Sequence, residues 1–219
     1  MNTKNINWKS QEGQDAWVFN TLQSKRNGYF VDLAAHDPVR HSNTYVLEQR
    51  FGWKGICIEP NNDRYKDLLE KRSSICINDI ISSESTEVEY VFRKNAPDIV
   101  SGTGLNHIKG FSNHPGTKKT TQAEKERGIS PDWGSEIRKA RTLESVLDSC
   151  RSPAVIDYLS LDVEGYEYEI MKNFKFDQYI FRCITVEGDL IHHLLVSNGY
   201  TFVTKGSQNR DSYYVYGEG

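Results

Sequence analysis

Five acidic residues stand where short apolar segments of the chain end, and together they indicate a ligand site. Asp32 and Glu59 each close an apolar run, Asp162 and Glu164 follow a third, and Glu187 closes a fourth. In open α/β sheets, ligands bind outside the carboxyl ends of parallel strands. A carboxylate after the second strand is well placed to accept both hydroxyls of a ribose. Several carboxylates around one cleft favour a cationic ligand. These residues therefore predict a nucleoside-bearing ligand with positive charge.

The elements that would position these acids begin with residues 28–60, which have the pattern of a βαβ unit. Residues 29–32 form an apolar run that ends in an acid, as expected for a buried parallel strand. The Ser-Asn-Thr sequence at 42–44 supplies N-cap chemistry for the helix that follows. Gly52 ends that helix, and residues 55–59 form a second apolar strand that also ends in an acid.

The rest of the chain alternates between helix and strand patterns. We expect helices over 14–23, 63–71, 142–149 and 190–197, a helix that contains Tyr168, and strands over 74–80, 87–93, 158–161 and 181–187. Two further strands, 200–204 and 212–216, form a closing hairpin. This order predicts a Rossmann-like α/β fold with a mostly parallel seven-stranded sheet and a C-terminal antiparallel hairpin.

Composition fits a single soluble enzyme domain. The 219 residues are enough for one substantial core, and the formal net charge of −3 gives no electrostatic reason to expect nucleic acid as a partner. No apolar stretch approaches the length of a membrane span, and residues 1–10 lack the pattern of a signal peptide. The four cysteines are widely spaced, which favours free thiols over disulfides or zinc ligation. We therefore expect a cytoplasmic protein and assign no metal site.

Residues 94–140 interrupt this regular order. They are rich in glycine and in basic residues. Segments of this length within a compact domain are usually functional covers or disordered insertions. We expect an insertion or lid on the acceptor side of the site, with a short helical turn over 121–127. A disordered surface insertion is the alternative.

Several motifs occur in a recognisable order along the chain. They lie at 28–35 (GYFVDLAA), 42–44 (SNT), 52–60 (GWKGICIEP), 142–147 (TLESVL) and 161–167 (LDVEGYE), with a leader at 10–15 (SQEGQD) and an ending that runs from 184–187 to 211–213. In these motifs the chain resembles the FkbM family of S-adenosylmethionine-dependent methyltransferases. The resemblance covers nearly the whole sequence except about residues 94–140.

The resemblance implies a class I methyltransferase fold, S-adenosylmethionine as cofactor, and O-methylation of a sugar, glycan or secondary metabolite. The implied cofactor-binding positions are Asp32, Ala34, Ser42, Asn43, Glu59, Pro60, Asp79 and Asp162. Methyl transfer is an in-line displacement, and a hydroxyl acceptor must lose its proton as it attacks. We expect Asp162 nearest the sulfonium, Glu164 nearer the acceptor, and Glu187 as a competing base. An N-methyl acceptor would need less base catalysis and stays open.

Three positions depart from the family pattern. Ala34 stands where the first glycine of the turn is usual, and Pro38 stands where the second often falls. Alanine permits close backbone approach but adopts positive φ only with strain, and proline removes an amide donor. Gly188 follows Glu187 where many members carry histidine, so no role of that histidine transfers to this chain.

Each acid also has a purely structural alternative. Glu59 could cap the helix that follows it, and Asp32 could bond only to backbone amides of its turn. Asp79 could contact an adenine amino group or be a solvated strand end. Asp162 and Glu164 would stabilise a helix N-terminus in any case.

Other protein classes fit less well. An NAD-dependent oxidoreductase would need a glycine fingerprint directly after the first strand, which residues 34–38 lack. Metal-assisted transfer through Asp162, Glu164 and Glu187 is conceivable, although no spacing compels it. The main alternative is a methyltransferase fold that has lost catalysis and serves as a binding or scaffold module. The missing glycines favour that alternative, and the retained acids argue against it.

Overall fold

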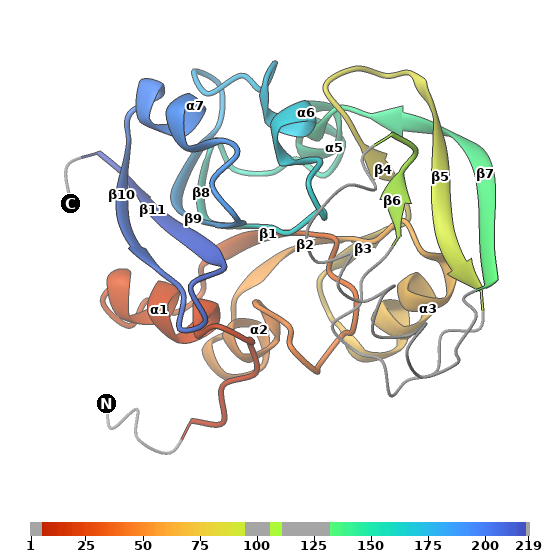
Figure 1. The fold of residues 1–219 in the computed structure, drawn as a ribbon. Helices are drawn as coiled ribbons and strands as arrows, with labels where there is room; N and C mark the ends of the chain where they lie inside the picture. Colours follow the sequence, from red (N-terminus) through yellow and green to blue (C-terminus); the bar gives the residue numbers. More distant parts are fainter. Residues whose placement is uncertain (1–5, 95–105, 111–131, 218–219) are drawn as a thin grey trace.

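The main sheet has seven strands in the computed structural model, which describes residues 6–94, 106–110 and 132–217. The strands are β1 (Tyr29–Leu33), β2 (Lys54–Ile58), β3 (Ile75–Ile77), β8 (Val155–Leu161), β9 (Ile180–Glu187), β10 (Tyr200–Lys205) and β11 (Asp211–Tyr216). Their order is β10-β11-β9-β8-β1-β2-β3 (Figure 1). Neighbours from β9 to β3 are parallel, whereas β11 is antiparallel to both β9 and β10.

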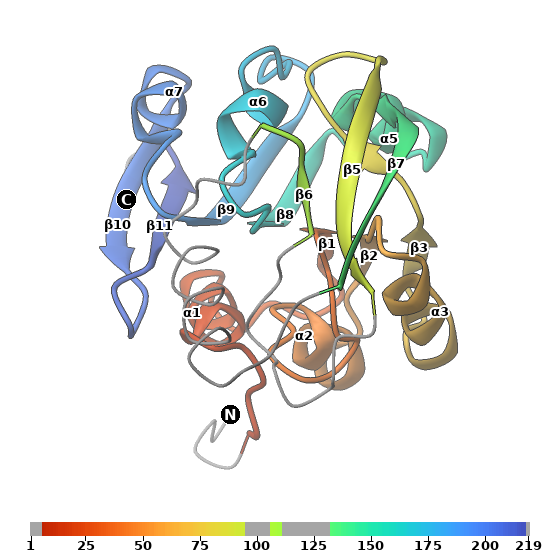
Figure 2. The same ribbon diagram turned by 45° about the vertical axis from the view of Figure 1, so that its right-hand side comes forward.

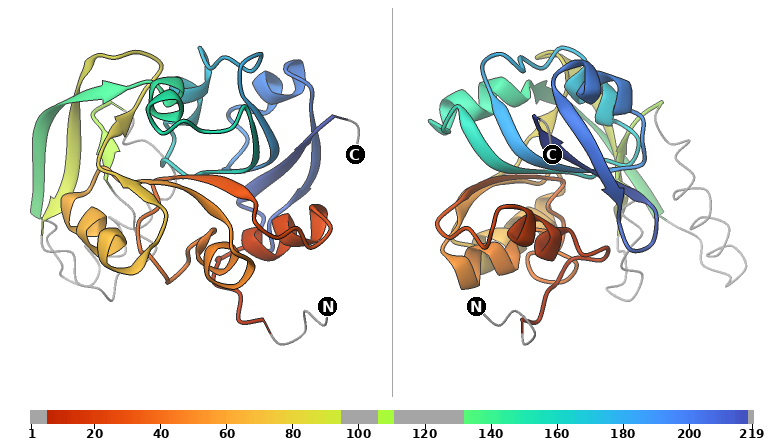
Figure 3. Two further views of the ribbon diagram at one scale, coloured as in Figure 1. Left: turned by 180° about the vertical axis from the view of Figure 1, so that it is seen from behind. Right: turned by 90° about the vertical axis from the view of Figure 1, so that its left-hand side faces the viewer.

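Helices lie on both faces of this sheet. They are α1 (Gln14–Thr21), α2 (Tyr45–Phe51), α3 (Asn62–Lys71), α5 (Leu143–Ser149), α6 (Glu167–Met171) and α7 (His192–Ser197). Helices α1 to α3 cover one face and α5 to α7 the other (Figures 1 and 3). The sequence sets several helix ends: Gly52 takes a left-handed conformation after α2, and the side chains of Asn61 and Thr142 accept amide hydrogen bonds at the starts of α3 and α5.

Each face of the sheet has its own buried core, and β1 contributes to both. Phe30 packs with residues of α1, α2 and α3, whereas Val31 and Leu33 pack with residues of α5, α6 and α7. This alternation follows from the two-residue period of a strand, and burial on both faces explains the apolar run. Because the parallel strands share one direction, their acid-bearing carboxyl ends meet at one edge of the sheet.

A second, smaller sheet lies beyond the β3 edge of the first in Figure 1, and in Figure 2 it stands in front of the first sheet. It contains β4 (Ile80–Ile81), β5 (Glu87–Lys94), β6 (His107–Ile108) and β7 (Asp132–Arg141), in the order β4-β7-β5-β6. Strand β5 is antiparallel to β6 and β7, and β4 is parallel to β7. A small core of Ile80, Tyr90 and Ala140 supports this sheet.

The predicted Rossmann-like fold with its closing hairpin is confirmed, and two predictions of elements need correction. The third strand was predicted over 74–80 with Asp79 at its end, but β3 stops at Ile77, and Ile80 belongs to the second sheet. Within 94–140 the structure contains β6 and most of β7, which the sequence did not predict. The helical turn predicted over 121–127 lies outside the described residues.

Two features bear on the environment of the protein. Cys57, Cys76, Cys150 and Cys183 are free thiols. In the described part of the chain, the helices are too short or too polar to cross a lipid bilayer.

Candidate active site

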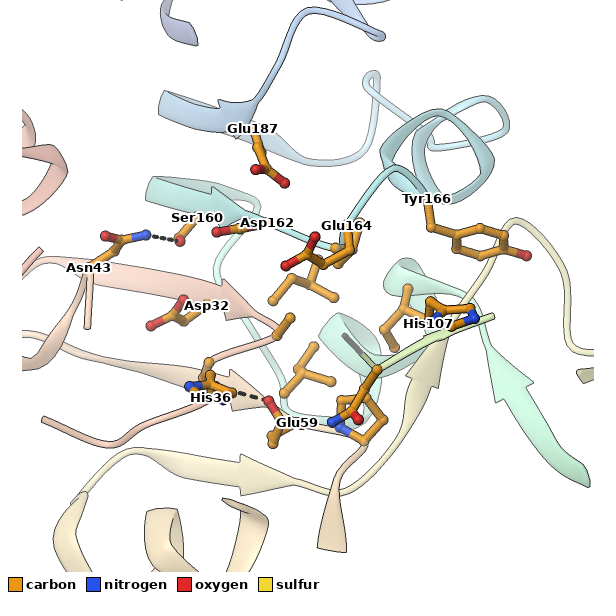
Figure 4. Close-up of a pocket in the computed structure, with 18 of the residues that line it drawn as sticks. Asp32, His36, Asn43, Glu59, His107, Ser160, Asp162, Glu164, Tyr166 and Glu187 are labelled. Carbon is orange, nitrogen blue, oxygen red and sulfur yellow. Dashed lines mark hydrogen bonds between the residues drawn. The ribbon is translucent and has the colours of Figure 1, made fainter. Parts of the chain in front are cut away.

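A pocket lies at the carboxyl edge of the parallel strands (Figure 4). Its lining contains all the acids that the sequence indicated, namely Asp32, Glu59, Asp79, Asp162, Glu164 and Glu187. The other predicted cofactor-binding positions, Ala34, Ser42, Asn43 and Pro60, line it as well. The second sheet contributes Tyr90, His107 and Ile108. The fold therefore brings every predicted site residue to one pocket.

The turn after β1 has the backbone conformation that glycine would favour, although it contains none. Ala34 has a φ of 58° and His36 a φ of 45°, both in the left-handed region. The turn is held against the end of β2, because the Ala35 amide donates to the Ile58 carbonyl at 3.1 Å. Ala34 thus takes a left-handed conformation that glycine would adopt without strain.

Pro38 lies in the next turn, which a side chain closes. The Oδ1 atom of Asp37 accepts hydrogen bonds from the amides of Val39 at 2.9 Å and Arg40 at 2.7 Å. The chain around Pro38 is therefore held by a carboxylate that spans the proline, as in an Asx turn.

Asp32 is anchored by a side chain rather than by turn amides. It is buried, and its Oδ2 atom accepts a hydrogen bond from the Thr44 hydroxyl at 2.5 Å. That hydroxyl accepts a further hydrogen bond from Arg72, which is paired with buried Glu48 at 2.8 Å. Burial raises the pKa of Asp32, and the Thr44 hydrogen bond opposes this. Asp32 therefore fixes the start of α2 relative to the strand end.

Glu59 does not cap the helix that follows it. Its Oε2 atom accepts the His36 amide at 2.9 Å and its Oε1 atom the Asn61 amide at 2.8 Å, whereas Asn61 itself caps α3. The side chain is almost completely buried, and burial raises its pKa to about 7. The neighbouring His36 side chain has the opposite shift. Its own burial, and then the positive charge of Arg64, lower the pKa of His36 to about 4, so its imidazole is neutral at neutral pH. Glu59 therefore presents a fixed carboxyl group between two loops of the pocket.

Asp79 lies in the short connection between β3 and β4, where its side chain is partly exposed. Its Oδ2 atom accepts a hydrogen bond from Arg141 at 3.0 Å, so this pocket-lining carboxylate is part of an ion pair with β7. Asn78 lies beside it and donates to the carbonyls of Glu59 at 2.8 Å and Pro60 at 3.0 Å. The ends of β2 and β3 are thereby connected to each other and to the second sheet.

Arg138 of β7 makes a second connection to these strand ends. It donates to the carbonyl of Pro60, and to the carbonyl of Asn78 at 2.8 Å. Its guanidinium lies over the ring of Tyr90, 5.8 Å from the centroid. Sequence analysis did not identify Arg138, because it lies in the segment that was expected to be a loop or lid.

Asp162, Glu164 and Glu187 converge at the ends of β8 and β9. One oxygen of each lies within 4.8 Å of the others, and Figure 4 shows the three carboxylates directed toward a common space. The turn that follows β8 and carries Asp162 and Glu164 is not extended, since Glu164 has a φ of 57°. Glu167 stabilises this turn by accepting the amides of Val163 at 3.2 Å and Gly165 at 3.1 Å.

The pKa of Asp162 reflects both its burial and the neighbouring carboxylates. Burial, and then the charges of Glu187 and Glu164, raise the pKa of Asp162 well above its ordinary value. An opposite charge beside such a group favours its ionised form. The same spacing could hold a divalent cation, although acidic groups of this kind are common without one. An organic cation would satisfy the cluster equally well.

Ser42 and Asn43 connect the pocket to the neighbouring strands. Ser42 accepts the amide of Tyr45, the first residue of α2, at 3.1 Å, whereas the N-cap residue is Thr44, whose side chain makes no capping hydrogen bond. Asn43 donates to the hydroxyl of Ser160 at 3.0 Å. Ser160 is a buried lining residue between Asp32 and Asp162 that sequence analysis treated only as part of a strand.

Several further lining residues come from segments that sequence analysis did not connect with the site. Gln11, Arg40, His41 and Arg210 form part of the wall, and His36 and His107 also line the pocket. A lining role for residues 11 and 210 could not be inferred locally, because they are far apart in the chain and meet only through the sheet.

The geometry defines a Rossmann-like α/β protein with an acidic pocket at the carboxyl edge of its sheet. A family profile described as "Methyltransferase FkbM domain" matches residues 32–199, well over half of the sequence. The chain belongs to the FkbM family of methyltransferases, and the resemblance seen in its motifs is confirmed.

Similarity to solved structures is more distant. The METTL16 MTase domain (crystal form 2) is 10% identical to this chain, with a TM-score of 0.45. The alignment covers 92% of this chain and 65% of that chain, so this protein spans less than two thirds of its length. No curated protein matches the sequence.

Proposed function

We propose that this protein uses S-adenosylmethionine to methylate a hydroxyl group of a small molecule or glycan. Family membership establishes the methyltransferase class, and the cofactor and the O-selectivity are our proposal. One observation carries it: three carboxylates, of Asp162, Glu164 and Glu187, meet at one end of a pocket that has Glu59 at the other. A cationic nucleoside matches both ends.

The residues of the pocket fit this cofactor. A carboxylate offers about four lone-pair sites, so Glu59 can accept ribose hydroxyls beyond its two amide bonds. Asp79 and Pro60 lie beside Glu59 on the side where an adenine would bind. Ala34 has a left-handed conformation that glycine, the usual residue at this family position, would adopt without strain. When bound, S-adenosylmethionine supplies a methyl group on a sulfonium with a neutral leaving group.

The carboxylates then divide between two tasks. A positive charge beside Asp162 would lower the pKa of this carboxyl group, and the ionised carboxylate would then stabilise that charge. Glu164 and Glu187 face the same space and can accept the proton of an acceptor hydroxyl within hydrogen-bond reach. We assign Glu164 as the base nearer the acceptor and Glu187 as its competitor. His107 and Ile108, from the segment 94–140, line the pocket and support the proposed role of that segment as a cover.

Cofactor binding is the first test. We expect S-adenosylhomocysteine, the demethylated product, to stabilise the protein saturably. A ligand at a hundred times its dissociation constant contributes about 2.7 kcal/mol, which raises the melting temperature by roughly 5–10 °C for a chain of this size. Absence of any shift with either S-adenosylmethionine or S-adenosylhomocysteine at millimolar concentration would contradict the proposal and favour a binding or scaffold module.

Substitutions then separate the two ends of the pocket. Glu59→Ala should weaken S-adenosylhomocysteine binding about tenfold or more, because it removes charged hydrogen-bond acceptors. Asp162→Asn and Glu164→Gln should lower methyl transfer about a hundredfold in an acceptor screen, with a smaller effect on affinity. Glu70→Ala, which removes an exposed carboxylate of α3, is the control for charge. Equal loss of affinity and turnover in all three site variants would show that these roles are wrong.

A further inference from the structure

The N-terminal leader at residues 10–15 has no role in the chemistry above, yet it is tightly built into the fold. Asp15 is buried and accepts hydrogen bonds from the Lys9 amide at 2.8 Å and the Ser10 hydroxyl at 2.5 Å. Gln14 donates to buried Asp211 at 2.6 Å. Ser10 forms a β-bridge with His41. The leader therefore links the loop after β1 to the first residue of β11.

Glu12 is the centre of this connection. Its carboxylate is completely buried, and its oxygens accept the Arg210 amide at 3.3 Å and the Arg210 Nε at 2.7 Å. The same carboxylate accepts the Gln208 amide at 3.3 Å, and the Tyr213 hydroxyl donates to the Glu12 carbonyl at 2.8 Å. A buried carboxylate with this many donors fixes the Arg210 side chain, which is about half exposed and lines the pocket.

Arg210 lies next to the acceptor-side carboxylates. Asp211 is the register partner of Glu187, and the Gly188 amide donates to the Arg210 carbonyl at 2.9 Å. The sheet order places β9 and β11 on one side of β1 and β8, and the ribose-side strands β2 and β3 on the other. A group bound at Arg210 would therefore lie on the Glu187 side of the pocket, away from Glu59.

Arg40 and His41 bring further donors to the same wall. Burial lowers the pKa of His41, and the positive charges of Arg40 and Arg210 lower it further, whereas the charge of Asp37 raises it. The imidazole of His41 is held by the Gln11 amide, 3.0 Å away. Two nearby acids already have partners: Glu12 with Arg210, and Asp37 with the amides of residues 39 and 40.

We propose that Arg40 and Arg210, with Gln11 and His41 beside them, bind an anionic group of the methyl acceptor. The acceptor would then be a hydroxylated compound that also carries a carboxylate or phosphate. Guanidinium groups suit this because they present several donors in a planar fork to either anion. The inference rests on the proposed function. Glu12 acts as a positioning residue for Arg210.

The test uses inorganic phosphate as the probe and the full chain saturated with S-adenosylhomocysteine, by calorimetry at constant ionic strength. We expect saturable binding that Arg40→Gln and Arg210→Gln each weaken about fivefold or more. Arg50→Gln makes the same change in charge at an exposed position at the end of α2 and should leave binding unchanged. Arg40→Gln carries the test if Arg210→Gln fails to fold, because Arg40 is exposed and its guanidinium is not needed for the Asp37 turn.

Three results would overturn the inference: no saturable phosphate binding, equal binding by the Arg40→Gln and Arg50→Gln variants, or competition between phosphate and S-adenosylhomocysteine. Competition would assign these residues to the carboxylate of the cofactor. The affinity for S-adenosylhomocysteine is measured separately in the same proteins. Failure of the proposed function would therefore appear as loss of that binding, whereas failure of the anion site would leave it intact.

Discussion

At the scale of single residues, Ala34 takes a backbone conformation that its Cβ atom disfavours. A φ of 58° costs an L-residue with a Cβ atom roughly 1 kcal/mol, and glycine avoids this cost. We therefore expect Ala34→Gly to raise the free energy of unfolding by about 1 kcal/mol, which corresponds to about 2–4 °C in melting temperature. Affinity for S-adenosylhomocysteine should be kept, because the turn already has this geometry.

The adjacent alanine supplies the matched control. Ala35 is buried and has an ordinary φ, so Ala35→Gly removes a packed methyl group and adds chain entropy to the unfolded state. It should destabilise the protein by about 1 kcal/mol. If both glycine variants lose stability in chemical denaturation, the left-handed conformation of Ala34 is not the source of strain.

The acidic side of the site could be predicted from residue types, and the basic side could not. Asp32, Glu59 and Glu187 each follow an apolar strand, and parallel strands must bring their carboxyl ends together. Arg40 and Arg210 lie in loops with no periodic pattern, and only the complete sheet with its leader brings them to one wall. The partner of Asp32 was also not predictable, because Thr44 reaches it across the turn rather than along it.

At the scale of elements, β7 shows why a strand in the second sheet escaped prediction. Its pattern is inverted: Ile137 is well exposed at 63%, whereas Arg138 on the opposite face is partly buried against the main sheet. An apolar residue outside and an arginine inside remove the alternation from which a half-buried strand is identified. The central strands of the main sheet, β1, β2, β8 and β9, were predictable because nearly all their residues are buried on both faces.

Arg138 offers a prediction about this element. Its guanidinium bonds to the carbonyls that follow β2 and β3, so Arg138→Gln should loosen the loops that hold Glu59 and Asn78. We expect S-adenosylhomocysteine to bind about tenfold more weakly, the equivalent of roughly 1.4 kcal/mol. Lys139→Gln removes the same charge from the exposed face of the same strand and is the control. Equal affinities in the two variants would show that the second sheet does not position the cofactor loops.

At the scale of the whole molecule, the pocket makes stability depend on pH, because the fold buries several carboxyl groups. Burial raises the pKa of Asp32, of Glu59 to about 7, and of Asp162 and Asp211. A carboxyl with a raised pKa binds its proton more tightly in the folded state. Its stabilising effect is complete below the unfolded pKa and is lost as pH rises through the folded pKa. His36 acts in the opposite direction, since its lowered pKa penalises the folded state only below about pH 6.5.

Between pH 6.5 and 8 the penalty from His36 fades as the unfolded histidine loses its remaining proton, and the carboxyl groups with raised pKa values decide the slope. We therefore expect the free energy of unfolding without ligand to fall over this interval, by up to about 1.4 kcal/mol per pH unit for each proton released. Glu59→Gln should reduce this slope, whereas Glu70→Gln, on the exposed side of α3, should preserve it. Denaturant unfolding of the three proteins at matched ionic strength measures the difference. A free energy of unfolding that rises with pH over this interval would contradict this expectation. It would mean that the acids of the pocket are ionised in the folded protein without ligand, and that other interactions offset their mutual repulsion.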